Sequence, residues 1–171
     1  ALNSRTVESV AFYTGGFPSR YGNRMSGVMD ITHQWLDRPF QTELGVSSFA
    51  TFIDTQQPLP VGRDGSLGVS YRQGDLADLA DYFDTRTGTP EYRDAALRMH
   101  TSLSEHTTLY AGLAYAEDDI LFEDLGERAS SQIDSWYGWL RVDMQPDDSF
   151  RGRLSLSVAD FARAKTQVNA E

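Results

Sequence analysis

The residues best suited to chemistry in this sequence are carboxylates, and they gather in two acidic runs. One run places an aspartate at every third position, at Asp75, Asp78 and Asp81, and the other contains Asp118 and Asp119. Hard cations such as Ca²⁺ take several carboxylate oxygens, and loops are suitable carriers. A spacing of three is also typical of one face of a short helix. We therefore expect solvated acidic loops here, with Ca²⁺ bridging as the alternative.

No enzyme signature accompanies these acids. The sequence lacks a Gly-x-Ser-x-Gly elbow, a phosphate-binding glycine loop, a His-Glu-x-x-His zinc motif and a dinucleotide glycine motif. Its histidines, His33, His100 and His106, are scattered, and a lone histidine on a strand is more often a polar lining residue than a ligand or a base. We therefore expect no catalytic residues, no enzyme activity and no resident cofactor.

A second group with recognition chemistry lies closer to the C-terminal end, where aromatic and arginine side chains alternate with apolar ones. Arginine binds anionic groups in a bidentate manner, and aromatic rings stack on flat ligands or sugars. These side chains would share one face of a hairpin, where they either contact a ligand or fill the space against a neighbouring part of the protein. The second interpretation is preferred. The group comprises Tyr137, Trp139, Arg141, Arg151 and Arg153.

Length and composition exclude several classes of protein. The 171 residues are enough for one ordinary domain. A net charge of −10 provides no basic patch for a nucleic acid, and the absence of cysteine excludes disulfides and thiolate zinc sites. The first ten residues do not read as a signal peptide, which would have been removed or lie upstream. No run approaches the roughly 20 apolar residues of a membrane helix, but a transmembrane strand shows lipid only every second residue.

The elements that must position these residues are strands, because apolar and polar residues alternate along most of the chain. In residues 134–144, for example, Leu140 and Val142 fall on one face and Tyr137 and Arg141 on the other. Two strands are expected before residue 39, at residues 7–13 and 28–32, and seven after it. The seven span residues 40–47, 49–58, 67–72, 92–103, 109–115, 134–144 and 150–161.

The connections between the expected strands alternate in length. Short turns are predicted near residues 62–66, 104–108 and 146–149, and long acidic loops at about 74–91 and 117–131. Short turns on one side and long loops on the other are typical of a transmembrane up-and-down barrel, although a soluble antiparallel sandwich alternates similarly. Charged residues in mid-strand and aromatic residues near strand ends favour the membrane. Lipid would then face Leu97, Met99, Leu140, Val142, Leu154 and Leu156, and the lumen would face Arg98, Tyr137, Arg141 and Arg153.

The first part of the chain differs in composition from the rest and is rich in glycine. Residues 7–22, VESVAFYTGGFPSRYG, followed by SGVMDIT at 26–32, resemble the end of the plug domain of TonB-dependent outer-membrane receptors. In that family an apolar strand, a glycine turn, a Tyr-Gly, a small residue plus Gly and a last strand lead into the barrel, and residues 43–49 are similar to its first tight hairpin. The family often has Glu where this chain has Ala11, so no plug–barrel salt bridge is assigned to Glu8. The matching plug residues are Gly15, Gly16, Pro18, Tyr21, Gly22, Gly27 and Asp30.

The residues of this motif also have a physical interpretation of their own. Gly15 and Gly16 permit positive φ in a tight turn, and Pro18 fixes the exit from it. Gly22 and Gly27 would let backbone approach a neighbouring surface closely, and Tyr21 would be buried with a partner for its hydroxyl. Taken singly, each glycine is ordinary loop punctuation; taken in this order, they favour the plug.

The resemblance implies an all-β protein: the C-terminal part of a plug domain in residues 1–35, followed by about seven antiparallel strands of a larger transmembrane β-barrel in residues 36–171. Such transporters close with about 22 strands, so the barrel would be incomplete here. It implies a receptor in the outer membrane of a Gram-negative bacterium that imports an iron–siderophore complex, cobalamin or an oligosaccharide. Its partners would be outer-membrane lipid, the nutrient and, through a segment upstream, the TonB complex. The alternative is a small β-barrel or β-sandwich that serves as a binding or adhesin module.

Overall fold

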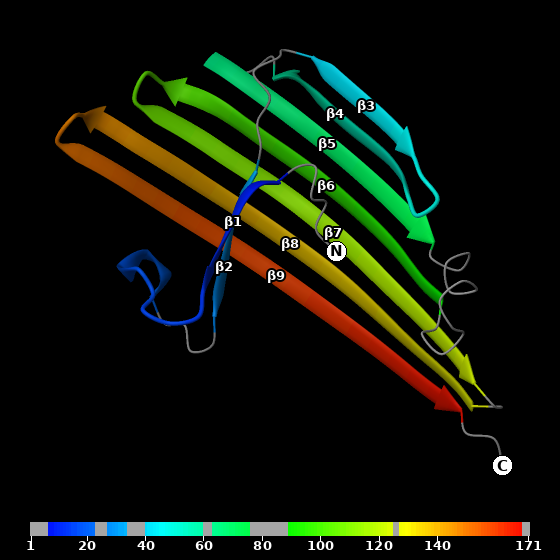
Figure 1. Cartoon of the computed structure of the whole chain (residues 1–171). Coiled ribbons are helices and arrows are strands. Elements are labelled where there is room, and N and C mark those ends of the chain that lie inside the picture. The colour runs from blue at the N-terminus through cyan, green and yellow to red at the C-terminus, as the bar shows by residue number, and fades with distance from the viewer. Residues whose placement is uncertain are drawn as a thin grey trace. The chain divides into compact units, whose positions relative to one another are not determined.

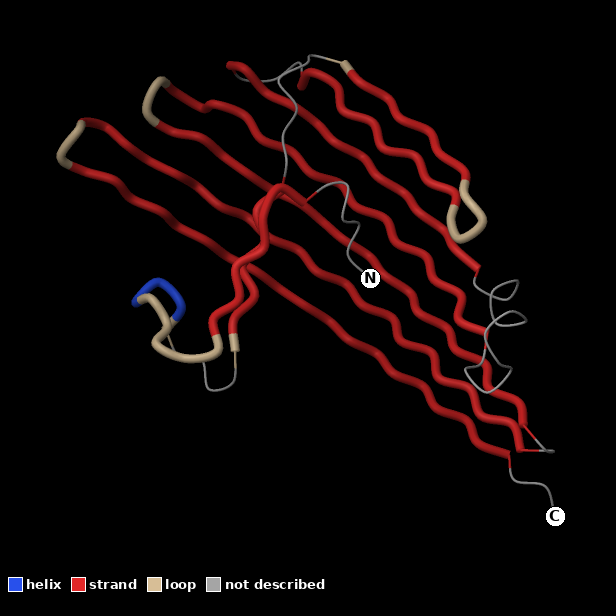
Figure 2. Tube along the Cα trace, in the orientation of Figure 1, coloured by secondary structure: helices blue, strands red, loops and turns tan. Residues whose placement is uncertain are grey.

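The computed structural model describes residues 7–22, 27–33, 40–59, 63–75, 89–124 and 127–168. The chain divides into two compact units, residues 2–37 and residues 38–171. The smaller unit holds β1 (Val7–Tyr13), the short 3₁₀ turn η2 (Ser19–Tyr21) and β2 (Val28–His33). In the larger unit every described element is a strand (Figure 1). The expectation of an all-β protein is confirmed for the described residues, most of which lie in the strands coloured red in Figure 2.

The larger unit is a seven-stranded antiparallel sheet in which each strand pairs with its neighbours in sequence. The number of strands expected after residue 39 is therefore confirmed. The strands lengthen from six residues in β3 to 21 in β8. They are β3 (Gln41–Val46), β4 (Thr51–Leu59), β5 (Arg63–Asp75), β6 (Thr89–Ser104), β7 (Thr107–Asp124), β8 (Glu127–Asp147) and β9 (Phe150–Val168).

Two of the predicted short turns lie where the sequence places them. Between β6 and β7, the backbone N–H of His106 donates to Ser104 Oγ (3.2 Å). Between β8 and β9, Asp147 Oδ1 accepts from the N–H groups of Ser149 (2.8 Å) and Phe150 (2.9 Å). Aspartate at this position of a turn stabilises it by accepting from the backbone just ahead.

Two of the predicted connections are wrong. Residues 117–131 do not form a long acidic loop, because β7 continues to Asp124 and β8 begins at Glu127. Acidic residues are poor strand formers in isolation, but here the backbone pairing of β7 with β8 continues in one register to Asp124 opposite Glu127. The predicted turn at 62–66 instead contains the start of β5, which is irregular: its register shifts between Arg63 and Ser66, and Asp64 has φ of 48°.

The register sorts the side chains of β6 to β9 onto two faces, because successive side chains alternate and paired residues share a face. The apolar face carries one row of Leu97, Leu113, Gly138 and Val158 and a second of Met99, Ala111, Leu140 and Leu156. The polar face carries one row of Arg98, Gly112, Trp139 and Ser157 and a second of His100, Tyr110, Arg141 and Ser155. The predicted separation of Leu140 and Leu154 from Arg141 and Arg153 is confirmed.

Exposure in the described part of the chain is the reverse of that in a water-soluble domain. Leu97, Leu113 and Leu140, on central strands, are 42%, 53% and 40% exposed. No hydrophobic side chain among the described residues is buried. The buried side chains are instead polar or charged, namely Gln56, Ser66, Ser70, Asp94, Arg98 and Thr101. Soluble proteins bury leucine and expose arginine.

In the smaller unit, β1 and β2 form an antiparallel hairpin. Gly16 has φ of 61°, which confirms that the glycine turn after β1 needs a residue able to adopt positive φ. Tyr21 of η2 donates a hydrogen bond to Asp30 of β2, and its ring lies 5.4 Å from that of Tyr13. The turn η2 is therefore held against β2 by this side-chain hydrogen bond.

Candidate functional site

The predicted aromatic and arginine group does come together on the polar face. The rings of Tyr137 and Trp139, two residues apart on β8, are stacked with centroids 5.6 Å apart and an interplanar angle of 25°. The guanidinium carbon of Arg141 lies 3.9 Å from the ring centroid of Tyr110 on β7. A cation held over an aromatic face is stabilised by the ring quadrupole. Tyr110 belongs to the group, although nothing in its sequence neighbourhood singled it out.

A carboxylate joins the arginines of this group. Arg153 donates to Asp143 through Nε (2.8 Å to Oδ1) and a terminal nitrogen (3.2 Å to Oδ2). Arg141 Nε lies 3.4 Å from the same carboxylate, and Arg151 donates to Gln145 Oε1 (3.3 Å). Arg141 and Arg153 thus share the Asp143 carboxylate, whereas Arg151 contacts an uncharged amide. These three arginines are grouped together in a protein whose net charge is strongly negative.

Two further ion pairs on the polar face lie deeper, and the sequence alone did not pair them. Arg72 donates from Nε to Asp94 Oδ2 (2.7 Å) and places a terminal nitrogen 2.6 Å from the same oxygen. Arg98, which is 3% exposed, lies 3.5 Å from Asp54 Oδ2. The sequence indicated only that these charged residues lie in mid-strand, at positions that alternate with apolar ones. The partner of each charge depends on the register between strands.

Three aromatic rings lie across glycines of the neighbouring strand, all on the polar face. A Cβ added to Gly112 would stand 2.1 Å from the indole of Trp139, and one added to Gly74 would stand 2.2 Å from the ring of Tyr92. The same relation holds between Gly45 and Phe52, at 2.0 Å. The glycines leave the space that these rings occupy, as in sheets whose curvature relies on glycine covered by an aromatic ring. They also fix the directions in which the rings point.

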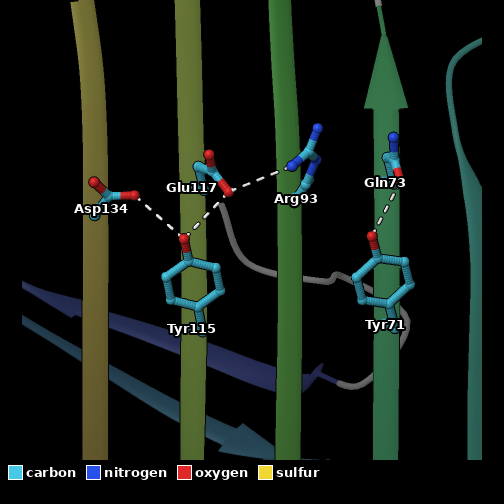
Figure 3. A network of polar contacts seen from close by, with 6 residues as sticks. All are labelled: Tyr71, Gln73, Arg93, Tyr115, Glu117 and Asp134. Carbon is cyan, nitrogen blue, oxygen red and sulfur yellow. Dashed lines mark hydrogen bonds and ion pairs between the residues drawn. The ribbon is translucent and has the colours of Figure 1, made fainter.

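The apolar rows end at a line of aromatic and polar side chains, shown in Figure 3. The rings of Tyr115 and Trp136 lie 4.7 Å apart. The Tyr115 hydroxyl lies 3.2 Å from both Glu117 Oε2 and Asp134 Oδ1, so it can donate a hydrogen bond to either carboxylate. Arg93 stands 3.9 Å from Glu117. On β5, on the other side of β6, the Tyr71 hydroxyl donates to Gln73 Oε1 (3.0 Å).

The structure does not assemble the candidate Ca²⁺ ligands that it describes. Asp118 and Asp119 lie in β7 on opposite faces, not in a loop, and Asp75 ends β5. Asp78 and Asp81 lie outside the described residues. Across the ranges that the structure describes, no group of three or more acidic or histidine side chains could hold a metal ion.

Asp119 lies beyond the line of aromatic residues and among other carboxylates. Burial raises the pKa of its carboxyl, and the negative charges of Glu117, Asp134 and Glu91 raise it further, while Arg93 lowers it. These acids therefore repel one another, and a fall in pH relieves the repulsion.

The plug-motif residues occupy the hairpin unit. Gly15, Gly16 and Pro18 lie between β1 and η2, and Gly27 immediately precedes β2. Among the described residues, the nearest atom to a Cβ on Gly22 would be Ser19 O, at 3.9 Å, and the nearest to one on Gly27 would be Tyr13 O, at 3.6 Å. The unit itself therefore has room for a small side chain at both positions. The Tyr21–Asp30 hydrogen bond supplies the hydroxyl partner expected for Tyr21, and the sequence did not indicate that Asp30 provides it.

Taken together, the polar face offers guanidinium groups, carboxylates and exposed rings, a combination suited to binding or packing. In the described ranges, no helix is long and apolar enough to cross a membrane. Searches with this sequence found no match among protein-family models, curated proteins or solved structures.

Proposed function

We propose that the chain is part of a TonB-dependent outer-membrane receptor that imports a scarce nutrient, such as an iron–siderophore complex, cobalamin or an oligosaccharide. Residues 1–35 are the end of its plug, and residues 36–171 are the first strands of its barrel. The polar face lines the lumen, and Tyr137, Trp139 and Arg141 contact the plug or the nutrient. Outer-membrane lipid contacts the apolar face, and the TonB complex supplies the energy that moves the plug.

The observation that carries this proposal is the inverted exposure of the sheet. Leu97, Leu113 and Leu140 are 40% exposed or more, while Arg98 is 3% exposed. A soluble sandwich would cover these leucines with a second sheet. A transmembrane barrel leaves them facing lipid and keeps its polar side chains on the lumenal side. The same observation counts against the small soluble binding module.

The line of side chains at the end of the apolar rows also supports a membrane position. Tyr71, Tyr115 and Trp136 follow the apolar rows, and charged residues such as Glu117 and Asp134 come next. Aromatic residues with a polar tip gather at membrane interfaces, because the ring enters the apolar layer while the hydroxyl or indole N–H remains hydrated.

The pairing of the sheet supports a barrel larger than seven strands. Among the described residues, β3 pairs only with β4 and β9 only with β8. Unpaired strand edges are not tolerated in lipid, because their backbone groups have no water to bond. Further strands would therefore complete the barrel beside β3 and β9.

The lipid-facing assignment can be tested by fluorescence quenching. These 171 residues contain no cysteine, so in the intact protein, with any cysteine elsewhere replaced by serine, a single cysteine can be placed at Leu140 or at its neighbour Arg141. Each would be labelled with an apolar fluorophore before refolding into vesicles of lipids brominated on their acyl chains. We expect strong quenching at position 140 and little at 141, because consecutive side chains point to opposite faces.

The pair Leu156 and Ser157 on β9 repeats the measurement on a second strand. Equal quenching at 140 and 141 and at 156 and 157 would contradict the assignment of faces. No quenching at any of the four positions would contradict membrane insertion and would favour the soluble module.

The plug assignment is tested separately at Gly22. The hairpin unit has room for a methyl group there, so Gly22→Ala should leave uptake normal. Gly22→Trp should block uptake while the receptor still inserts, because a packed barrel interior has no space for the added ring. The assay compares outer-membrane abundance with energised uptake of iron–siderophore, cobalamin and maltooligosaccharide. Normal uptake by an inserted Gly22→Trp receptor would contradict the plug.

A further inference from the structure

Three aromatic rings form a line across β8 and β9 on the polar face. Trp139 and Tyr137 are stacked on β8, with centroids 5.6 Å apart. Phe161 lies diagonally across from Tyr137, because Tyr137 pairs with Ala159 and Phe161 is the next residue of β9 on the same face. Tyr137 and Phe161 are 46% and 72% exposed. Successive rows on one face are about 6.6 Å apart along a strand, so the rings follow one another at a regular interval.

Two cations continue this line beyond Phe161. Arg163 and Lys165 are the next side chains of the polar face along β9, and both are exposed. Their cross-strand partners on β8, Ile133 and Ser131, are uncharged. In the part of the chain that the structure describes, neither cation forms an ion pair. Both therefore remain available to an anionic ligand.

The acidic residues of this end of the sheet do not cancel the two cations. In residues 131–137 of β8 and 159–165 of β9, every residue of the polar face is uncharged or cationic. Asp118 on β7 is the described carboxylate closest to Arg163 in the register of this face, and Ile133 separates them. Two strand spacings amount to about 9.6 Å. The other acids of this region belong to rows of the opposite face, namely Glu91, Glu117, Asp119, Asp134 and Asp160.

We propose that this line binds an oligosaccharide that carries a carboxylate at one end, with its sugar rings on Trp139, Tyr137 and Phe161 and its carboxylate on Arg163 and Lys165. The inference rests on the proposed function and narrows the nutrient to an acidic oligosaccharide. Sugar rings have apolar faces that pack on aromatic side chains, and a guanidinium binds a carboxylate through two parallel hydrogen bonds. Rings repeated in successive rows fit an occupant made of repeated units, whereas a compact iron complex or cobalamin would contact only part of the line.

An oligonucleotide also combines flat units with negative charge, but its charge is distributed differently. It carries a phosphate at every unit, and its binding proteins combine stacked rings with a positively charged groove along the backbone. Here the rings and the cations are separated, because the rows of Tyr137 and Phe161 contain no cation on β8 or β9. A ligand that is uncharged along the rings and anionic at one end fits this order.

The test separates the effect of the charge from that of the rings. The intact protein, purified in detergent, would be titrated by calorimetry with cellopentaose, maltopentaose and the aldonic acid of each. For the linkage that binds, we expect the acid to bind more tightly than the neutral sugar. Arg163→Gln/Lys165→Gln should weaken binding of the acid about tenfold (about 1.4 kcal/mol) and leave the neutral sugar unchanged. The control is Arg93→Gln, which removes an exposed arginine from the opposite face and should bind both sugars as the parent does.

A third variant, Phe161→Ser, tests the stacking and should weaken binding of the acid and the neutral sugar alike. The proposal would be overturned if neither acid bound, if acid and neutral sugar bound equally, or if Arg93→Gln lost as much affinity as the double variant. Equally tight binding of a thymidine pentanucleotide would overturn the assignment to a sugar.

Failure of this site and failure of the proposed function give different results. If lipid quenches the probe at 140 and Gly22→Trp blocks uptake, but neither acid binds, the receptor stands and the acidic oligosaccharide site fails. If an acid binds with the expected variant effects but no position is quenched, the binding site stands and the membrane position fails.

Discussion

Leu97 and Arg98 are consecutive residues of β6, yet their surroundings have little in common. Leu97 is 42% exposed on the apolar face, while Arg98 is 3% exposed on the polar face and is paired with Asp54. The apolar face consists of side chains that could replace one another with little loss, because dispersion and transfer to an apolar medium are non-directional. The polar face consists of contacts that depend on a particular partner and distance. The same strands therefore carry one tolerant surface and one specific surface.

The specificity of the polar face has two physical sources. Buried charges must be compensated, so removing one member of a pair costs more than the pair contributes. Rings such as Trp139 also occupy space that exists only because the opposite residue, Gly112, lacks a side chain. On the apolar face the leucines end in open space, and an added methyl group can be accommodated by their flexible side chains. This contrast predicts opposite sensitivities for neighbouring residues.

The largest difference is expected between Arg98 and Leu97. Arg98→Met removes the cation beside Asp54 and should lower the free energy of unfolding by about 3–5 kcal/mol. Leu97→Ala should cost much less, because the leucine is half exposed on the apolar face. Urea unfolding of the intact protein in detergent micelles, followed by tryptophan fluorescence, measures the loss of stability in both variants. A larger loss for Leu97→Ala would mean that the two faces have been exchanged.

A charge placed on each face gives the next difference. Arg on the lipid side of a transmembrane strand costs about 2–4 kcal/mol near the middle of the bilayer, so Leu156→Arg should reduce insertion into the outer membrane. Ser157→Arg lies on the polar face and should insert nearly as well as the parent. Immunoblots of folded protein, with and without heating, compare the two variants. Similar abundance of the two variants would contradict the proposed difference between the apolar and polar faces.

The smallest difference concerns two glycines. Gly112→Ala forces its methyl group into the ring of Trp139, so overpacking should destabilise the protein by about 1–3 kcal/mol. In Gly138→Ala the nearest atoms to the new methyl group are the side-chain ends of Leu113 and Val158, at 3.2 and 3.3 Å. These flexible ends can move aside, so the variant should be nearly neutral. Thermal unfolding in detergent compares the stabilities of the two variants. The double variant Gly112→Ala/Trp139→Leu should recover part of the loss, and its failure to do so would show that the ring is not the cause.

Local periodicity in the sequence determined much of this architecture. Because side chains in a strand alternate with a period of two, the pattern in residues 134–144 was enough to separate Leu140 from Arg141, and turn chemistry was enough to place a turn after Asp147. Charge in mid-strand also indicated that one face is polar. The prediction failed at residues 117–131, where acidic residues suggested a loop. The ladder continues there because β7 and β8 pair in one register along their whole length, from Thr107 opposite Met144 to Asp124 opposite Glu127, and this register is set over many residues rather than by the local acidic composition.

Only the tertiary structure decided which residues meet. Asp54 and Arg98 lie on strands separated by β5 and are brought together by two successive registers. Trp139 and Gly112 become neighbours only when β7 and β8 pair, and Tyr21 reaches Asp30 only when the chain returns as β2. A one-residue slip in any of these pairings would turn one strand over relative to the next. Alternation is a property of each strand alone, whereas a partner is a property of the register between strands.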